Sequence, residues 1–479
     1  MIVSHFIVNR LSTFILGGTS LLMVGACSVL PTLGVKGKVS DVQKVRDLAP
    51  GGWSAAGAPR AGAATGWLSE FGSAPLNRLV DQAIAGNRDL RVAAGRVKEA
   101  RAQVRVVGAD LLPQIGADAA GSRSQRASGQ RFVGLGTRDN RFQVTADIAW
   151  ELDFWGRLRD ERGAVLATAE AEEADLHAAR LSLAANTVKA AVTLAEAEAQ
   201  IAIAQENVRR RTLHLGVLEK QLDRGLDADR SALDVSLSRA DLARAESTLA
   251  SRKREADAGR RSLETLLGSY PAGKESGLGG LPIMKSSVPV GLPSELLLRR
   301  PDLIAAERRL DSALQETSAA KKAFLPSFRL TGNSGYSTQE LSQLLTPESI
   351  VWSVAGALAQ NVFQGGRIAA TADAARARYG QALEQYAADV LEAFREVETA
   401  LAAEVFLREQ EASLVRAAAE AETAVRLAIG QYERGLSDVL TLLDAQQRVF
   451  DSNSALIGVR AQRLRNRADL HLALGGDFN

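Results

Sequence analysis

The stretch Phe154-Trp155-Gly156-Arg157 decides the fold, because the chain repeats it as Phe363-Gln364-Gly365-Gly366-Arg367. The glycine of the first stretch lies 69 residues before Gly225, and the last glycine of the second stretch lies 69 residues before Gly435. The span 157–223 holds no proline, which predicts an unbroken helix ~100 Å long at ~1.5 Å per residue. A long helical span that recurs at the same length predicts two similar halves.

A second pair of motifs supports the repeat. Asp89 lies 24 residues before Pro113, and Asp302 lies 24 residues before Pro326. A length of 479 residues would suggest about three ordinary domains, whereas the repeat favours one elongated body. We predict a first repeat at 67–270, a Gly-, Pro- and Ser-rich linker at 271–293, and a second repeat at 294–479.

The N-terminal region has the pattern of an export signal, with Arg10 ahead of an apolar run that is too short to predict a membrane span. The run ends in Val24-Gly25-Ala26-Cys27, which resembles the lipobox of bacterial lipoproteins. Cys27 is the only cysteine, which excludes an intrachain disulfide and a cysteine metal cluster. We predict a signal peptide at 1–26, lipid attachment such as palmitate at Cys27, and an extended tether at 27–66. An ordinary cleaved signal with an incidental cysteine is the alternative.

Alternation of apolar and polar residues predicts a strand at 141–153, with two opposite faces. One face comprises Phe142, Val144, Ala146, Ile148, Trp150 and Leu152. The other comprises Gln143, Thr145, Asp147, Ala149, Glu151 and Asp153. Weaker patterns predict strands at 114–124, 327–336 and 350–363. A soluble sheet could show the same alternation, but the length and the acidic second face favour a membrane barrel with a water-filled lumen.

Four strands in one chain cannot close a barrel with a lumen. An open sheet edge cannot face lipid, because its backbone groups would be unsatisfied. The strand count therefore predicts an obligate oligomer in which several chains share one barrel.

The long helices carry coiled-coil spacing. In the first half, apolar residues at intervals of three and four form a seam that Arg211 interrupts. The seam comprises Leu194, Ala197, Ile201, Ala204, Val208, Leu215, Leu218 and Leu222. Its counterpart in the second half comprises Val390, Phe394, Val397 and Leu401.

Five motifs together span most of the mature chain. They are Trp67-Leu68-Ser69-Glu70-Phe71, Asn87-Arg88-Asp89-Leu90, Arg299-Arg300-Pro301-Asp302-Leu303, the Phe363–Arg367 stretch, and Tyr432-Glu433-Arg434-Gly435 followed by Leu443-Asp444-Ala445-Gln446. In combination they resemble the outer-membrane factor family, the TolC-like and OprM-like channels, and in particular the NodT-type efflux lipoproteins.

The resemblance implies a mainly α fold with a transmembrane β-barrel: a long helical coiled-coil tunnel and a twelve-stranded barrel shared by a homotrimer. It implies a lipid-anchored outer-membrane protein that extends into the periplasm. The expected partners are a periplasmic adaptor protein, an inner-membrane pump of the RND type, and outer-membrane lipid. The expected function is a passive exit duct for drugs and other small molecules. A duct for type I protein secretion and a non-transporting coiled-coil scaffold are the alternatives.

The turns at Gly225 and Gly435 should lie at the periplasmic tip, where glycine permits a tight reversal. By resemblance, Gly435, Leu436 and Ser437 contact the adaptor. The equivalent first turn is Gly225, Leu226 and Asp227, in which the aspartate departs from the family pattern.

Leu440 and Asp444 stand at i and i+4 and so share a helix face. By resemblance this face lines the closed periplasmic end, where three copies would form a leucine ring and an acidic ring that favours cations. Asp438 is a second candidate for the acidic ring. Packing for Leu440 and a solvated charge for Asp444 are the alternatives.

Other functional classes find little support in this sequence. The net charge of +2 argues against a nucleic-acid binder. The four histidines are scattered, and no phosphate loop or nucleophile elbow is present. We therefore expect no enzymatic activity, no cofactor and no metal.

Overall fold

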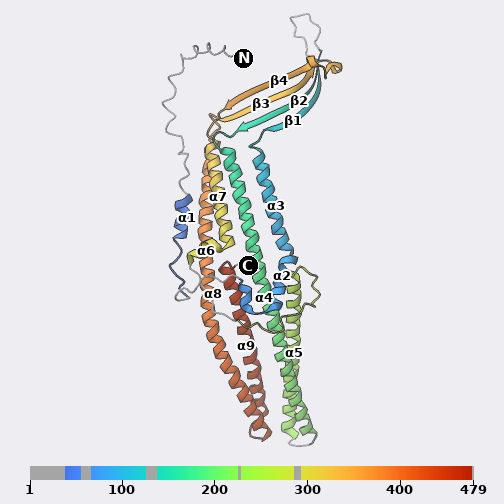
Figure 1. Ribbon diagram of the computed structural model, residues 1–479. Coiled ribbons are helices and arrows are strands. Elements are labelled where there is room, and N and C mark those ends of the chain that lie inside the picture. The colour runs from blue at the N-terminus through green and yellow to red at the C-terminus, as the bar shows by residue number, and fades with distance from the viewer. Residues whose placement is uncertain (1–37, 56–65, 126–137, 225–227, 285–292, 477–479) are drawn as a thin grey trace, which may run out of the picture.

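The computed structural model describes residues 38–55, 66–125, 138–224, 228–284 and 293–476. The molecule is elongated, with a four-stranded sheet at one end and two helical hairpin tips at the other (Figure 1). Two helices run from the sheet toward the tips: α4 (Arg157–Asp223) and α8 (Arg367–Glu433), each of 67 residues. The predicted repeat is therefore confirmed in its longest elements.

Shorter helices flank these two. α3 (Arg88–Ala109) and α7 (Pro301–Lys322) have 22 residues each and lie in the half nearer the sheet. α5 (Ala228–Leu266) and α9 (Val439–Ala473) return from the tips. Local signals set the boundaries, since the side chain of Asn87 accepts a hydrogen bond from the Leu90 amide at 3.0 Å and a proline opens α7.

The remaining helical segments are short. They are α1 (Lys38–Arg46), the 3₁₀ turn η1 (Trp67–Phe71), α2 (Ala74–Gly86), α6 (Pro293–Arg299), and the 3₁₀ turns η2 (Leu341–Gln343) and η3 (Pro347–Ser349). None of the helices in the described ranges combines the length and the apolar character that a membrane-spanning helix needs.

The predicted extended tether at 27–66 is wrong for its central part. Residues 38–46 form α1, which packs Val42 and Val45 against α8. The segment that follows is held by Glu398 of α8, whose carboxylate accepts the amides of Ser54 at 2.7 Å and Ala55 at 2.9 Å. Long-range partners in α8 fix this segment, and a search for local periodicity could not detect them.

The sheet is antiparallel, in the order β1 (Gln114–Gln125), β2 (Arg138–Leu152), β3 (Ser327–Thr338) and β4 (Ile350–Ala359). Cross-strand pairing places residues of like character on one face. Val144 stands between Ala119 and Tyr336, and the adjacent residue Thr145 stands between Asp118 and Gly335. The alternation predicted for β2 is therefore continued across the sheet, with one apolar and one polar face.

The register assigns the other strand residues to these faces. The apolar face includes Ile115, Ala117, Ala119, Val144, Ala146, Ile148, Leu330, Tyr336, Ile350, Trp352 and Val354. The polar face includes Asp118, Gln143, Thr145, Asp147, Asn333 and Ser353.

All four strands differ from the prediction in at least one boundary: β1 and β3 end later, β2 begins earlier and ends one residue earlier, and β4 ends earlier. β4 ends at Ala359 rather than at residue 363, because its partner β3 begins at Ser327, directly after Pro326, which has no amide to continue the ladder. Asp153 lies beyond β2 and does not belong to the polar face of the strand. Its carboxylate instead accepts the amides of Leu158 at 3.1 Å and Arg159 at 3.0 Å, which stabilises the first turn of α4.

The helical body contains two large apolar clusters. One joins α1, α6 and α7 to α8, and it includes all four predicted seam residues of the second half, Val390 to Leu401. The other packs Trp67 and Phe71 of η1 against α2, α4, α5 and α9. The seam interruption at Arg211 is buried (5% exposed), and its guanidinium bonds Asp241 of α5 at 2.9 Å and Gln447 of α9 at 2.9 Å. The guanidinium of Arg211 thus links α4 to both α5 and α9.

Candidate tip site

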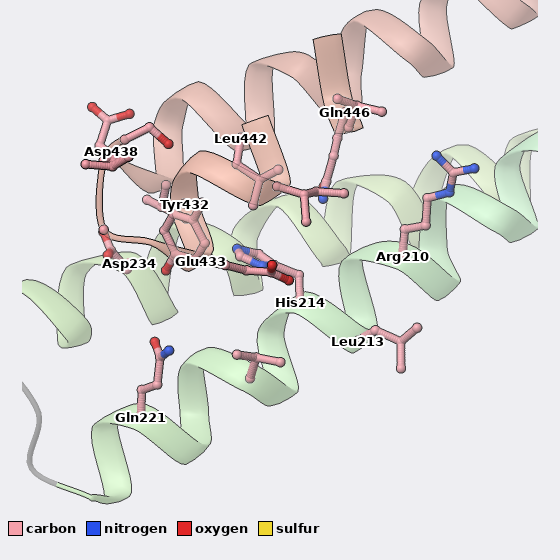
Figure 2. A pocket seen from close by; sticks show the side chains of 17 residues that line it. Arg210, Leu213, His214, Gln221, Asp234, Tyr432, Glu433, Asp438, Leu442 and Gln446 are labelled. Carbon is pink, nitrogen blue, oxygen red and sulfur yellow. The ribbon is translucent and has the colours of Figure 1, made fainter. Parts of the chain in front are cut away.

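The ends of α4, α5, α8 and α9 surround a groove of about 1020 Å³ (Figure 2). These helix ends lie at the end of the molecule opposite the sheet (Figure 1). We call it the tip groove. It is lined by Arg210, Leu213, His214, Val217, Gln221, Asp234, Val425, Ile429, Tyr432, Glu433, Gly435, Leu436, Ser437, Asp438, Val439, Leu442 and Gln446. The three residues predicted for the second tip turn are all among them.

The α8–α9 turn has a well-defined helix ending. Gly435 adopts φ 73°, and its amide donates to Tyr432 at 2.9 Å, while the Leu436 amide donates to Gln431 at 2.9 Å. These bonds are those of a Schellman motif, which needs the left-handed conformation that glycine tolerates. The turn leaves Leu436 71% exposed, so a large apolar side chain is presented to solvent at the tip.

Several predicted residues lie outside the described part of the chain. Gly225, Leu226 and Asp227 of the first tip turn are among them, as is Cys27. Their predicted roles therefore stay predictions.

Asp438 has a structural role that was not predicted from the sequence. It is the N-cap of α9, where its carboxylate accepts the Thr441 amide at 2.8 Å and the Thr441 hydroxyl at 2.6 Å. An N-cap aspartate stabilises the first turn of a helix and complements its dipole. The capping gives Asp438 a structural role, and its predicted place in an acidic ring stays a prediction.

Leu440 and Asp444 lie on one exposed face of α9, as their spacing predicted. The leucine is 56% exposed and the aspartate side chain 62% exposed. Sequence reasoning missed Arg448, whose guanidinium donates to the Asp444 carboxylate at 2.8 Å. The i, i+4 spacing of an acid and a base was the available signal. If Asp444 side chains of several chains formed a ring, the Arg448 guanidinium groups would therefore lie one helical turn away from it.

His214 and Tyr432 join the two hairpins, and no motif singled out His214. Their rings meet edge to face, with centroids 5.4 Å apart. Beside them Leu215 and Leu218 of α4 pack with Val235 of α5, and Val439 and Leu443 of α9 complete the cluster. We call this set of seven residues the tip joint.

No group of three or more His, Cys, Asp or Glu side chains with metal-binding geometry occurs within the described ranges. The tip groove is instead bordered by apolar side chains and scattered charges. Such a surface suits contact with protein or packing against other helices.

Known proteins share this architecture. A sequence profile described as outer membrane efflux protein matches residues 79–269 and 292–476. Outer membrane protein OprJ of Pseudomonas aeruginosa is 34% identical over 468 residues, which cover 96% of this chain and 94% of OprJ. Cation efflux system protein CusC of Escherichia coli K12 is 32% identical over 418 residues, which cover 86% of this chain and 88% of CusC. The solved structure of the outer-membrane channel OprN superposes with a TM-score of 0.84 at 30% identity, covering 90% of this chain and 97% of that one.

Proposed function

The chain belongs to the outer membrane efflux protein family and is an outer-membrane channel component of an efflux system, and we propose that it works as a passive exit duct for small molecules. The observation that carries the proposal is the pairing of a two-faced sheet with helices of equal length. The apolar face suits lipid, and the polar face suits a lumen. The helices carry the duct ~100 Å away from the membrane.

The duct requires further chains. Within the described residues, one protomer contributes four strands and leaves β1 and β4 with open edges. Closure of these edges in a homotrimer would give a twelve-stranded barrel and would satisfy their backbone groups. We place a periplasmic adaptor at the tip, where Leu436 is exposed, and an energy-supplying inner-membrane pump beyond it. Selection of the transported molecule falls to the pump.

Assembly size and conductance test the proposal together. Purified protein in detergent should have the mass of three chains and should form discrete single-channel steps in planar bilayers. A monomer, or a trimer that conducts no ions under any condition, would contradict the duct. It would favour a scaffold instead.

The lipid anchor supplies a separate test. Cys27→Ser should abolish incorporation of labelled fatty acid, because the thiol is the acceptor. The variant should still assemble, since the sheet provides its own membrane contact. Equal labelling of wild type and variant would refute lipidation at this residue.

The gate prediction concerns Leu440 and Asp444. Leu440→Ala should raise conductance roughly twofold or more, because three branched side chains leave the constriction. Asp444→Ala should also raise conductance. It should shift ion preference toward anions, since Arg448 remains without its carboxylate partner. Conductance and reversal potential in asymmetric salt measure both effects.

Two exposed residues farther from the tip provide matched controls. Asp451 follows Asp444 by seven residues on α9, about 10 Å along the axis. It too accepts a hydrogen bond on its own helix, from Gln447 four residues before it, whereas the donor to Asp444 lies four residues after it. Leu391 is 54% exposed on α8. Asp451→Ala and Leu391→Ala should leave conductance nearly unchanged. If these variants open the channel and the tip variants do not, the constriction lies elsewhere.

A further inference from the structure

The tip joint contains a histidine with an unusual environment. His214 of α4 projects into the tip groove toward α8 and α9 (Figure 2). Its Nε2 atom is buried and has no hydrogen-bond partner among the described residues. The ring packs against Tyr432 of α8 at an interplanar angle of 67°. A polar atom buried without a partner destabilises the state that buries it. Burial of this nitrogen therefore destabilises the arrangement in which the two hairpins are joined.

Charged groups surround the tip joint on all four helical segments. Arg210 and Arg211 lie on α4, Asp234 on α5, Glu433 on α8 and Asp438 on α9. Arg211 is already paired with Asp241, and Asp438 already caps α9. Burial lowers the pKa of His214 below its ordinary value of 6.5; Asp234 acts in the opposite direction, and Arg211 adds to the lowering.

We propose that His214 is a proton-sensitive switch in the tip joint. Protonation of its ring separates the α4–α5 hairpin from the α8–α9 hairpin and widens the periplasmic end. The inference rests on the proposed function, because it assumes that the tip restricts the duct. A protonated ring needs an acceptor at Nε2. The joined hairpins provide none among the described residues, whereas water provides one when they part.

The direction of the effect follows from linkage. The joined state disfavours a protonated ring, so it keeps its full stabilisation above pH 6.5, the ordinary pKa of the group, where the ring is neutral whether the hairpins are joined or apart. This stabilisation is lost as the pH falls through the lowered pKa. The channel should therefore open on acidification. Among side chains with unperturbed pKa values, only histidine changes its charge in this pH range.

Single-channel recording of the full-length assembly at controlled pH tests this directly. Wild-type conductance should rise about threefold between about pH 7.5 and 5.5, because the three joints of one trimer respond to the same protons. His214→Gln should keep the low conductance at every pH, since it cannot take up a proton. His214→Arg should conduct at the high level at every pH, since it is always charged. Heat-resistant assembly of each variant shows that it has folded.

The exposed His177, on the same helix but nearer the sheet, provides the control, and His177→Gln should keep the wild-type response. A wild-type conductance that does not change with pH would overturn the role of His214 and leave the duct intact. A pH response that survives in His214→Gln would overturn it as well. Assembled protein that conducts at no pH would instead contradict the duct itself.

Discussion

Val144→Arg should prevent stable insertion into the outer membrane, whereas Gln143→Arg should be tolerated. The two residues are neighbours near the middle of β2 but face opposite sides of the sheet. Val144 lies among apolar residues between Ala119 and Tyr336. A lipid-facing arginine at the bilayer midplane costs about 2–4 kcal/mol per copy. Every chain in an assembly would incur that cost.

Gln143 is the matched control because its side chain already reaches an acid. Its Nε2 donates to Asp118 at 3.5 Å, so an arginine there would gain a carboxylate partner in the lumen. The amount of heat-resistant oligomer in outer-membrane fractions measures both variants. Equal amounts from the two variants would mean that the apolar face does not meet lipid.

Much of the architecture could be predicted from the sequence because it depends on local signals. Equal spacing between glycine turns predicted two helices of equal length, and both have 67 residues. Period-two alternation predicted the faces of β2, and the cross-strand register confirms them. These features follow from backbone geometry and side-chain period, which neighbouring residues determine.

Pairings between distant residues could not be predicted. Arg211 looked like a defect in an apolar seam, but it bonds Gln447, which is 236 residues away. The contact between His214 and Tyr432 likewise joins two hairpins from different repeats. Asp153 followed the strand pattern and yet caps a helix. In each case a polar side chain is placed by a partner that single-sequence periodicity does not identify.

A buried ion-pair network offers the strongest test of how the halves are held together. Glu404 of α8 is 4% exposed and accepts a hydrogen bond from Arg463 of α9 at 2.9 Å. Arg467, which is 3% exposed, lies 3.7 Å from the same carboxylate and 3.2 Å from Glu70 of η1. Glu70 also bonds His471 at 3.0 Å, and Trp67 stacks on that imidazole. The network therefore links the first motif of the chain to its last helix.

Glu404→Ala should destabilise each chain by about 3–5 kcal/mol, because the buried Arg467 and the partly buried Arg463 lose a shared carboxylate. Thermal unfolding of the assembly should begin at a clearly lower temperature, and protease should cleave the region near Trp67 sooner. Glu392→Ala on the same helix removes an exposed acid that pairs with Arg395, and it should leave the unfolding temperature unchanged. The comparison separates burial from charge, since both variants delete one carboxylate beside arginine. If the two unfold alike, the network contributes no more than a surface pair, and apolar packing alone joins η1 to α9.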